Sequence, residues 1–496
     1  MPVIELLVDD PLPRWQADCA RRLAAAGAGV RLRDGTGQGG RSWRAVAGRV
    51  CQLKPTAAEP EASTDTAPAD VVIDLAGRGE GSDRRWRLLC GDGRPLAAPF
   101  PFADQWCRPG GLATVLLVDE AGRVLRSAHL SVQGRFYTRL VDDTLKFAAL
   151  LPALAWRDRL NGIAPSGLPG PGTRRGGGSP WALIGGARRY ARQRVVDALS
   201  PVLWRIGLVL QPIHAFLDPT HRPRIDWLTR IEAAAYCADP IAHPCHPGEI
   251  WWERYDYLTH HGVLQRARLG SAVPAETVDL GVSCHMSFPG MVKLDGQTLL
   301  IPEMSESGTT RLFSLDREGH WECLAILPVP GVDPVLFRWE DRLWLGLTRA
   351  DLDKRSNFCL WYATSPSGPW TEHEANPVKI DVRSARSAGP LFRHDGTLYR
   401  PAQDCTLSYG KRVVINRVID CTPTRFREEV AAVVGPQPDW STPHGLHTLA
   451  ACGEHTLIDA KLTVVSTAGL AAKLGRRVGR PTRPPASSHR SPVHPR

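Results

Sequence analysis

The chain has 496 residues, of which 43% are hydrophobic and 23% charged, so the composition predicts a folded protein of about two domains. We find neither a basic and apolar leader nor an uncharged apolar run of about 18 residues, and we therefore expect a cytoplasmic protein without a transmembrane segment. The net charge of +10 is concentrated in residues 174–194 and 473–496, each with six Arg. Basic residues gathered in such segments, and not on a folded face, argue against a nucleic-acid partner.

Residues 1–160 are predicted to form an α/β domain. Apolar runs typical of strands occur at Val3–Val8 and at residues 70–75, 113–119 and 124–132, and apolar residues near helical spacing occur at 15–26 and 137–160. Strands that alternate with helices favour this fold class.

Residues 161–200 are interpreted as a linker rich in Gly, Pro and Arg that ends in a basic helix. Weak contact between this basic segment and a membrane surface is the alternative to a plain linker helix. Residues 469–496 are rich in Arg, Pro and Ser, and we expect a disordered basic tail there.

Residues 201–468 repeat one pattern, which predicts an all-β five-bladed propeller. A strand containing Pro, an acidic turn and a second strand recur around Pro240, Pro289, Pro334 and Pro390, and a weaker fifth copy covers residues 445–459. Further strand signals lie between the copies. Four strands per period, repeated five times, are typical of a propeller.

The first strand of each propeller blade lines the central channel, so polar residues at matched positions are predicted to converge there. The starts of the first strands contribute Asp239, His285, Asp333, Arg383 with Arg386, and His447. The ends of the second strands contribute Glu253, Glu303, Gln403 with Asp404, and Asp459. Sugar hydrolysis needs one protonated and one ionised carboxyl group, which such a set can supply. For each single residue, the open alternative is that it only lines a polar, hydrated channel and has no role in chemistry or binding.

Cofactors and metals are not expected from this sequence. The clustered histidines at 243, 246, 260 and 261 are interrupted by Pro and lack the spacing of a zinc site. The Gly-rich stretch near residue 176 does not follow a strand, and hence it does not read as a phosphate loop.

The propeller resembles a known module in its motifs, which are Asp-Pro at 239–240, His-Met-Ser-Phe-Pro at 285–289, Ile-Pro-Glu at 301–303, Arg-Ser-Ala-Arg at 383–386 and Arg-Pro-Ala-Gln-Asp at 400–404. It is similar to the N-terminal propeller module of plant glucosamine inositolphosphorylceramide transferases, which also occurs in bacterial proteins, and thereby to five-bladed arabinanases, xylosidases and invertases. The resemblance implies a sugar-binding channel in which Asp239 matches the catalytic Asp of those glycosidases. Their acid, a Glu before Gly-Pro, is replaced here by Ser387 and Ala388, so Glu303 or Glu253 would have to substitute for it.

The N-terminal region resembles, more faintly, formyltransferase-like domains. Formyl transfer in that family uses an Asn, a His and an Asp, whereas the first Asn of this chain is Asn161 and the single preceding His is His129. The resemblance therefore implies a degenerate domain.

Three functional hypotheses follow. The first is a glycosidase-like protein, or one acting on activated sugars in glycan or glycolipid biosynthesis, with Asp239 as base or nucleophile, Glu303 as acid and Asp333 tuning their pKa values. The remaining channel residues would bind the substrate. The second is a non-catalytic glycan-binding scaffold for a glycosyltransferase partner. The third, sugar N-formylation by the N-terminal domain, lacks its catalytic set.

Overall fold

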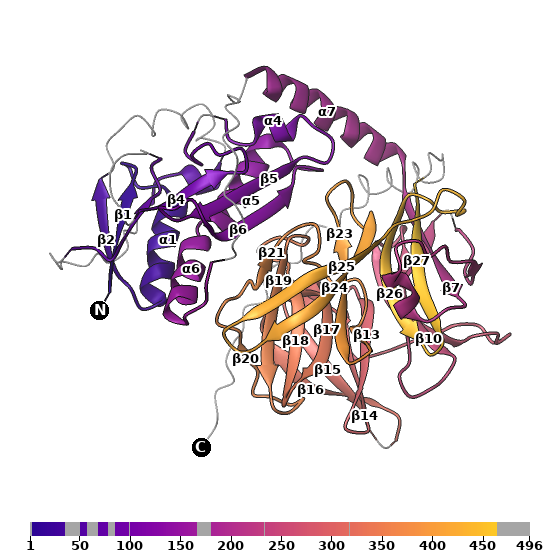
Figure 1. Cartoon of the computed structure of the whole chain (residues 1–496). Helices are drawn as coiled ribbons and strands as arrows, with labels where there is room; N and C mark the ends of the chain where they lie inside the picture. The colour runs from indigo at the N-terminus through magenta and orange to yellow at the C-terminus, as the bar shows by residue number, and fades with distance from the viewer. Residues whose placement is uncertain are drawn as a thin grey trace, which may run out of the picture.

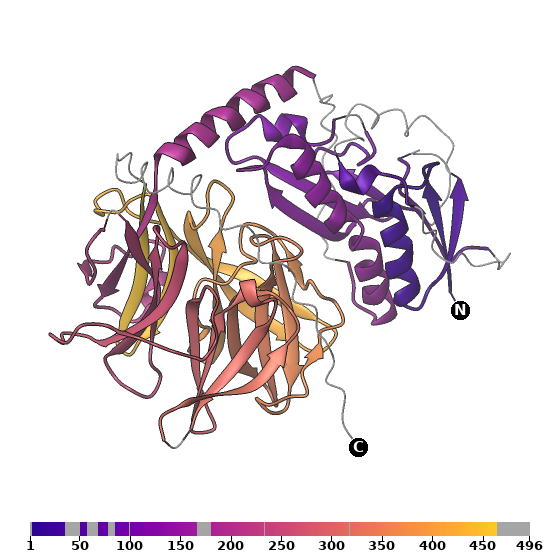
Figure 2. The same cartoon turned by 180° about the vertical axis from the view of Figure 1, so that it is seen from behind.

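The computed structural model shows an N-terminal α/β domain and a β-propeller (Figure 1 and Figure 2). It describes residues 2–34, 50–56, 68–77, 85–98, 100–165, 180–232, 234–316 and 318–463. The predicted tail at 469–496 and most of the Gly/Pro-rich linker lie outside these residues. In the described ranges, no helix has the length and apolar character needed to cross a bilayer.

The N-terminal domain is built on a six-stranded sheet with the strand order β2-β1-β3-β4-β5-β6. The strands are β1 (Val3–Val8), β2 (Gly29–Asp34), β3 (Val71–Asp74), β4 (Arg85–Cys90), β5 (Leu112–Val118) and β6 (Val124–Ser131). The pairs β2–β1, β1–β3 and β3–β4 are parallel, whereas the pairs β4–β5 and β5–β6 are antiparallel. All four predicted strands are present, and β2 and β4 are additional.

Helices of this domain are α1 (Arg14–Ala25), α4 (Ala103–Trp106), α5 (Tyr137–Ala148) and α6 (Leu151–Leu160). The single helix expected over residues 137–160 is thus two helices. Pro152 lies in the first turn of α6, where a missing backbone N–H costs nothing and the ring favours the start of a new helix. The formyltransferase-like character of the domain stays a prediction.

The propeller has five blades, as the repeats predict. Blade 1 is β9 (Ala235–Ala242), β10 (Glu249–Asp256), β11 (His261–Arg268) and β12 (Glu276–Thr277). Blade 2 is β13 (Ser287–Leu294), β14 (Gln297–Glu303), β15 (Thr310–Leu315) and β16 (Trp321–Leu327). Blade 3 is β17 (Gly331–Trp339), β18 (Arg342–Arg349), β19 (Asn357–Ala363) and β20 (Thr371–Glu372), with β21 (Lys379–Ile380) beside β19. Blade 4 is β22 (Phe392–His394), β23 (Thr397–Asp404), β24 (Arg412–Cys421) and β25 (Phe426–Val434).

Blade 5 is assembled from both ends of the propeller sequence. Its inner strands β26 (Gly445–Cys452) and β27 (His455–Thr463) come last in the chain, and its outer strands β7 (Val202–Val209) and β8 (Ile225–Trp227) come first. Strand β27 pairs with β7 along its whole length, from Thr456↔Val209 to Thr463↔Val202. This pairing closes the ring by backbone hydrogen bonds, and Figure 1 shows the two strands side by side.

The repeated prolines mark β-bulges in the inner strands. The residue before each proline has a left-handed φ: 54° at Asp239, 42° at Phe288, 45° at Asp333 and 132° at Gly389. In blades 1 to 3 the strand register shifts at the same place. A bulge accommodates Pro, which has no N–H for the ladder, and turns the neighbouring side chain out of its regular direction. The sequence repeat therefore fixes where Asp239 and Asp333 lie around the channel.

The N-terminal domain contacts three loops of the propeller. Two follow the second strands of blades 3 and 4, and one precedes the first strand of blade 4. Ser131 Oγ donates to the Thr406 carbonyl at 2.7 Å, and Arg135 forms an ion pair with Asp353. The His129 carbonyl accepts from the Val382 N–H at 2.9 Å. These contacts hold the N-terminal sheet over the end of the propeller where those loops emerge (Figure 1).

Both residues that could have served formyl transfer take part in the same domain interface. Besides its backbone contact, the His129 ring is engaged by Thr114 Oγ1 at 3.0 Å, and burial lowers the pKa of His129. Asn161 donates to Glu374 at 3.4 Å. Their contacts are those of interface residues.

Candidate functional site in the propeller channel

One cluster of channel residues joins blade 5 to blade 1 around His447. Its Nδ1 lies 2.7 Å from the Asp459 carboxylate, and its Nε2 lies 3.4 Å from Asp239 Oδ1. Thr448 Oγ1 also donates to Asp239 Oδ1 at 3.0 Å. The imidazole therefore lies between two carboxylates, with one ring nitrogen directed at each.

Protonation in this cluster is set by burial and by the two carboxylates. Burial alone would lower the pKa of His447, but Asp459 and Asp239 outweigh it and the pKa is raised. Burial raises the pKa of Asp239 from 3.8 to about 6, although the nearby His447 acts in the opposite direction. The raised pKa favours a protonated His447, which is hydrogen-bonded to Asp459 through Nδ1 and directs Nε2 at Asp239 at ion-pair distance.

This arrangement also bears on metal binding. Asp239, His447 and Asp459 each offer a ligand atom, and these atoms lie within 4.8 Å of one another. Both ring nitrogens of His447 are directed at carboxylate oxygens. A His that ligates a metal commonly donates its other N–H to a carboxylate, so this geometry fits a metal-ligand set as well as an ion-pair network.

A second cluster joins blades 2, 3 and 4 around Asp333. Arg386 binds the Asp333 carboxylate through Nε at 2.5 Å and through a terminal nitrogen at 3.1 Å. Gln403 Nε2 donates to the same carboxylate at 2.7 Å. Glu303 lies 3.8 Å from Arg386 and accepts the Asp333 backbone N–H at 3.3 Å. Asp333 is thus fully engaged by neighbouring side chains.

Burial again governs the charge of Asp333. It raises the pKa of the Asp333 carboxyl from 3.8 to about 7, against the opposing effect of Arg386. Glu303 next to Asp333 contributes to the rise, because two carboxylates at short range disfavour double ionisation.

Glu253 lies between the two clusters and has a different environment. Glu253 is part of β10 and pairs with Ala238 of β9, the residue directly before Asp239. Burial raises the pKa of Glu253 well above its usual range, and Asp239 is the first of several carboxylates that add to the effect. His285 Nε2 lies 3.6 Å from Glu253 Oε1, while His285 Nδ1 accepts the Gly262 N–H. Burial and the neighbouring carboxylates therefore both favour the protonated form of Glu253.

Two of the predicted site residues lie outside these clusters. Arg383 forms a two-pronged ion pair with Asp381, at 2.7–3.1 Å, close to the domain interface. Asp404 accepts from Arg412 at 2.7 Å and from the Thr406 N–H at 2.9 Å. The alternation of side chains along β23 explains the second case, because Gln403 faces Asp333 and its neighbour must face the other way.

Two aromatic residues that the sequence analysis did not select pack over the clusters. Trp204 of β7 stacks on the His447 ring with centroids 3.8 Å apart and an interplanar angle of 20°. Tyr409, in the loop between β23 and β24, accepts from Arg386 at 3.2 Å and meets His447 edge-on. Lys461 lies over Trp204, and burial lowers the pKa of its ammonium group to about 8. Neither aromatic residue belongs to the repeated pattern, which is why that pattern gave no sign of them.

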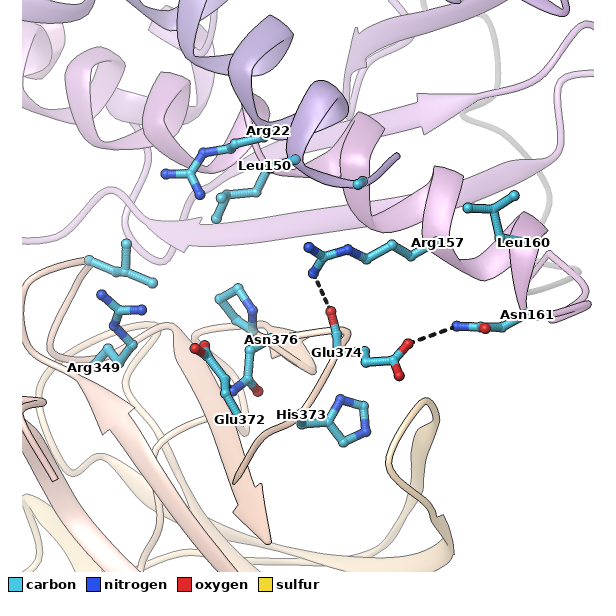
Figure 3. Close-up of a pocket in the computed structure, with 14 residues that line it drawn as sticks. Arg22, Leu150, Arg157, Leu160, Asn161, Arg349, Glu372, His373, Glu374 and Asn376 are labelled. Carbon is cyan, nitrogen blue, oxygen red and sulfur yellow. Dashed lines mark hydrogen bonds between the residues drawn. The ribbon is translucent and has the colours of Figure 1, made fainter. Parts of the chain in front are cut away.

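A separate cavity of about 680 Å³ lies between the N-terminal domain and blade 3 (Figure 3). Arg22 and Arg157 extend into it from one side and Arg349 from the other. Each guanidinium group is already engaged: Arg22 by Asp18, Arg349 by Asp351, and Arg157 by the Glu374 carbonyl. The cavity belongs to the domain interface, apart from the channel residues.

Solved structures with a similar fold include glycoside hydrolases. A family 117 glycoside hydrolase from Zobellia galactanivorans is 12% identical, with a TM-score of 0.30 and coverage of 42% of this chain and 72% of the other. A family 43 enzyme from Xanthomonas citri, solved with xylotriose, is 15% identical, with a TM-score of 0.30 and coverage of 47% and 88%.

Sequence relatives match part of this chain. The protein named glucosamine inositolphosphorylceramide transferase 1 of Oryza sativa subsp. japonica is 31% identical over 158 residues, which are 30% of this chain and 21% of the relative. Its namesake in Arabidopsis thaliana is 32% identical over the same shares. The chain thus spans about a fifth of the length of these relatives. Residues 251–439 match the family model described as glucosamine inositolphosphorylceramide transferase 1, N-terminal, which confirms the predicted resemblance for this part of the propeller.

Proposed function

We propose that the propeller is a carbohydrate-active domain in which Glu253 donates a proton and Asp239 acts as base or nucleophile on a glycan or an activated sugar. The observation that carries the proposal is the pairing of two buried carboxyl groups on neighbouring strands that have different partners. Burial raises the pKa of Asp239 to about 6 against the effect of His447, whereas burial and the neighbouring carboxylates together raise the pKa of Glu253 well above its usual range. Such a pair is what acid–base cleavage or transfer of a glycosidic bond requires.

This proposal assigns the acid to Glu253, which the sequence left open as an alternative to Glu303. Glu303 accepts the Asp333 N–H and the Ser305 hydroxyl and faces Arg386. These contacts engage Glu303 in holding the backbone of Asp333 and the side chain of Ser305. Glu253 has several carboxylates near it and His285 at 3.6 Å, and the carboxylates add to the effect of burial in favouring its protonated form.

The proposed setting is glycan or glycolipid biosynthesis. It is supported by the match of residues 251–439 to the N-terminal module of proteins named glucosamine inositolphosphorylceramide transferase 1. The name of those relatives describes a sugar, glucosamine, and a phosphorylated inositol lipid as the two groups involved.

The burial of Asp239 and Glu253 limits how a substrate can reach them. Asp239 and Glu253 are each 4% exposed, so a sugar ring contacts them only after neighbouring groups move. Tyr409, in the loop of residues 405–411, is one of these neighbouring groups, because it contacts both Arg386 and His447 and is itself only partly buried.

The proposal is tested by exposing the full chain to a panel of glycans and sugar nucleotides and quantifying released products by mass spectrometry. Wild-type turnover that falls at least about a hundredfold in both Asp239→Asn and Glu253→Gln is the expected result. Equal turnover in the wild type and both variants would remove the two residues from the mechanism.

A non-catalytic glycan-binding scaffold for a glycosyltransferase is the second candidate. It is favoured by the ion pair of Asp333 with Arg386, to which Gln403 adds a hydrogen bond, because this pairing leaves neither charged group free for chemistry. Glycan binding in calorimetry, without product from any member of the panel, would support this candidate. Binding that is lost in Asp239→Asn would place the ligand in the channel.

A further inference from the structure

Helix α7 (Pro180–Leu199) runs from the N-terminal domain to blade 5, along the outside of the molecule (Figure 1 and Figure 2). One face of the helix packs on the N-terminal domain. Gly186 lies directly against the Trp106 ring, where any larger residue would clash, and Arg189 donates twice to the Trp106 carbonyl, at 3.0 and 2.7 Å. Tyr190 meets Phe136 edge-on at 5.5 Å. These contacts fix the rotation of the helix about its axis.

The opposite face forms a continuous exposed stripe. Its members, separated by three or four residues, are Trp181, Ile184, Arg188, Arg192, Val195 and Leu199. This spacing places them on one side of a helix. The apolar members are 78% exposed at Trp181, 45% at Ile184, 58% at Val195 and 38% at Leu199. We call these six residues the α7 stripe.

The chemistry of the α7 stripe combines a large interfacial aromatic, three aliphatic side chains and two guanidinium groups. The helix as a whole contains four Arg against a single acid, Asp197, which accepts from Gln193 at 2.7 Å. A neutral apolar partner would leave the guanidinium groups desolvated, whereas an anionic surface would pair with them.

We propose that the α7 stripe docks the protein on an anionic lipid bilayer, with the helix lying in the plane of the headgroups. Trp is favoured at the boundary between headgroups and acyl chains, and Arg pairs with lipid phosphate. A helix of 20 residues is about 30 Å long, so the stripe offers an extended line of contact. Its apolar residues reach the acyl boundary and its arginines stay among the headgroups, which suits surface binding rather than insertion across the bilayer.

This inference is independent of the chemistry in the channel. None of the α7 stripe residues contributes to the clusters around His447 and Asp333, and the match to the transferase module begins at residue 251. Failure of docking would therefore leave the proposed acid–base pair untouched, and failure of turnover would leave docking untouched.

The experiment is co-sedimentation of the full chain with large vesicles of phosphatidylcholine alone or with about 30% phosphatidylglycerol. We expect binding to the anionic vesicles, weakened by salt, and little binding to the neutral ones. Arg188→Gln combined with Arg192→Gln should lower the partition coefficient about 25-fold, that is, about fivefold for each Arg near an anionic surface. Trp181→Ala should also lower it.

The matched control removes two positive charges elsewhere. Arg268→Gln with Lys293→Gln changes exposed residues on blades 1 and 2, and this variant should sediment as the wild type does. Equal sedimentation of both double variants would overturn the assignment to α7, as would loss of binding on deletion of residues 473–496 with α7 intact. Absence of binding to anionic vesicles, together with retention on single-stranded nucleic acid, would assign the stripe to a different polyanion and reject the proposal.

Discussion

The carboxylate of Asp459 accepts a hydrogen bond from the backbone N–H of Asp239 at 3.0 Å, although 220 residues separate the two in the chain. The same relationship recurs where Glu303 accepts the N–H of Asp333 at 3.3 Å. In both cases the second strand of one blade supplies the acceptor, and the donor is the left-handed residue of the next blade's inner strand. Strained backbone of this kind persists where surrounding groups hold it. Two channel carboxylates therefore support the ring itself.

Replacing Asp459 should consequently destabilise the propeller. In Asp459→Ala the N–H groups of Asp239, His447 and Thr448 lose their shared acceptor, and His447 loses its closer carboxylate. Removing one partner of a buried ion pair costs about 3–5 kcal/mol of the free energy of unfolding. Urea denaturation measures this change.

The control for that measurement is Asp439→Ala, which removes an exposed acid and should change the free energy of unfolding by less than about 0.5 kcal/mol. Similar midpoints for Asp459→Ala and Asp439→Ala would show that the inter-blade bonds contribute nothing to stability.

Asp239 should make the stability of the propeller depend on pH. Its pKa is about 6 in the folded protein against the ordinary 3.8, so the native state binds more protons than the unfolded state between these values. The free energy of unfolding contributed by this group therefore falls as the pH rises from about 4 to 6. Asp239→Asn lacks the titration, and its stability relative to the wild type should rise by roughly 3 kcal/mol from pH 4 to pH 8. Chemical denaturation of both proteins at several pH values tests this, and a constant difference would contradict it.

Much of the fold could be predicted because the propeller repeats its own sequence. The prolines at 240, 289 and 334 occur at one position of the blade, and the structure places a bulge at each. The closure of blade 5 by β7 could not be predicted, since that strand pairs with residues more than 240 positions away and carries no repeat motif. Strand β2 was missed because its alternating Arg and apolar residues lack a continuous apolar run.

For the candidate site, the sequence predicted positions better than roles. Asp239 and Asp333 face the channel because they share a bulge, but their pKa values depend on burial and on partners from other blades. Arg383 and Arg386 are three residues apart and were expected to act together, yet Arg383 pairs with Asp381 and Arg386 with Asp333. Local pairing of this kind depends on the irregular backbone before β22, which composition and spacing do not specify.

The contact between the two domains should be weakened by changing Arg135. This residue joins Asp353 of the propeller and also lies 3.3 Å from Asp143 of α5, with its side chain only 11% exposed. Arg135→Ala leaves Asp353 without its ion-pair partner, whereas Asp143 keeps Arg139 and Lys146. Removing one partner of a largely buried ion pair leads us to expect about 3–5 kcal/mol of destabilisation. Differential scanning calorimetry should show the wild type as one transition and the variant as two separated ones.

Arg108→Ala is the matched control, because this Arg is exposed on the same domain. A single transition shifted equally in both variants would indicate that Arg135 does not couple the domains.

If Asp239 is the base and Glu253 the acid, product formation should depend on pH in a defined way. Activity requires Asp239 to be ionised, so the rate should rise as the pH passes about 6, the pKa of that carboxyl. It also requires a proton on Glu253, whose raised pKa places the decline at higher pH. Glu253→Gln cannot donate, and the rate should fall about a hundredfold or more while the rise near pH 6 is retained. Asp404→Asn alters a buried carboxyl that binds Arg412 outside the clusters, and its profile should keep both limbs. A Glu253→Gln profile identical to that of Asp404→Asn would assign the proton to another group.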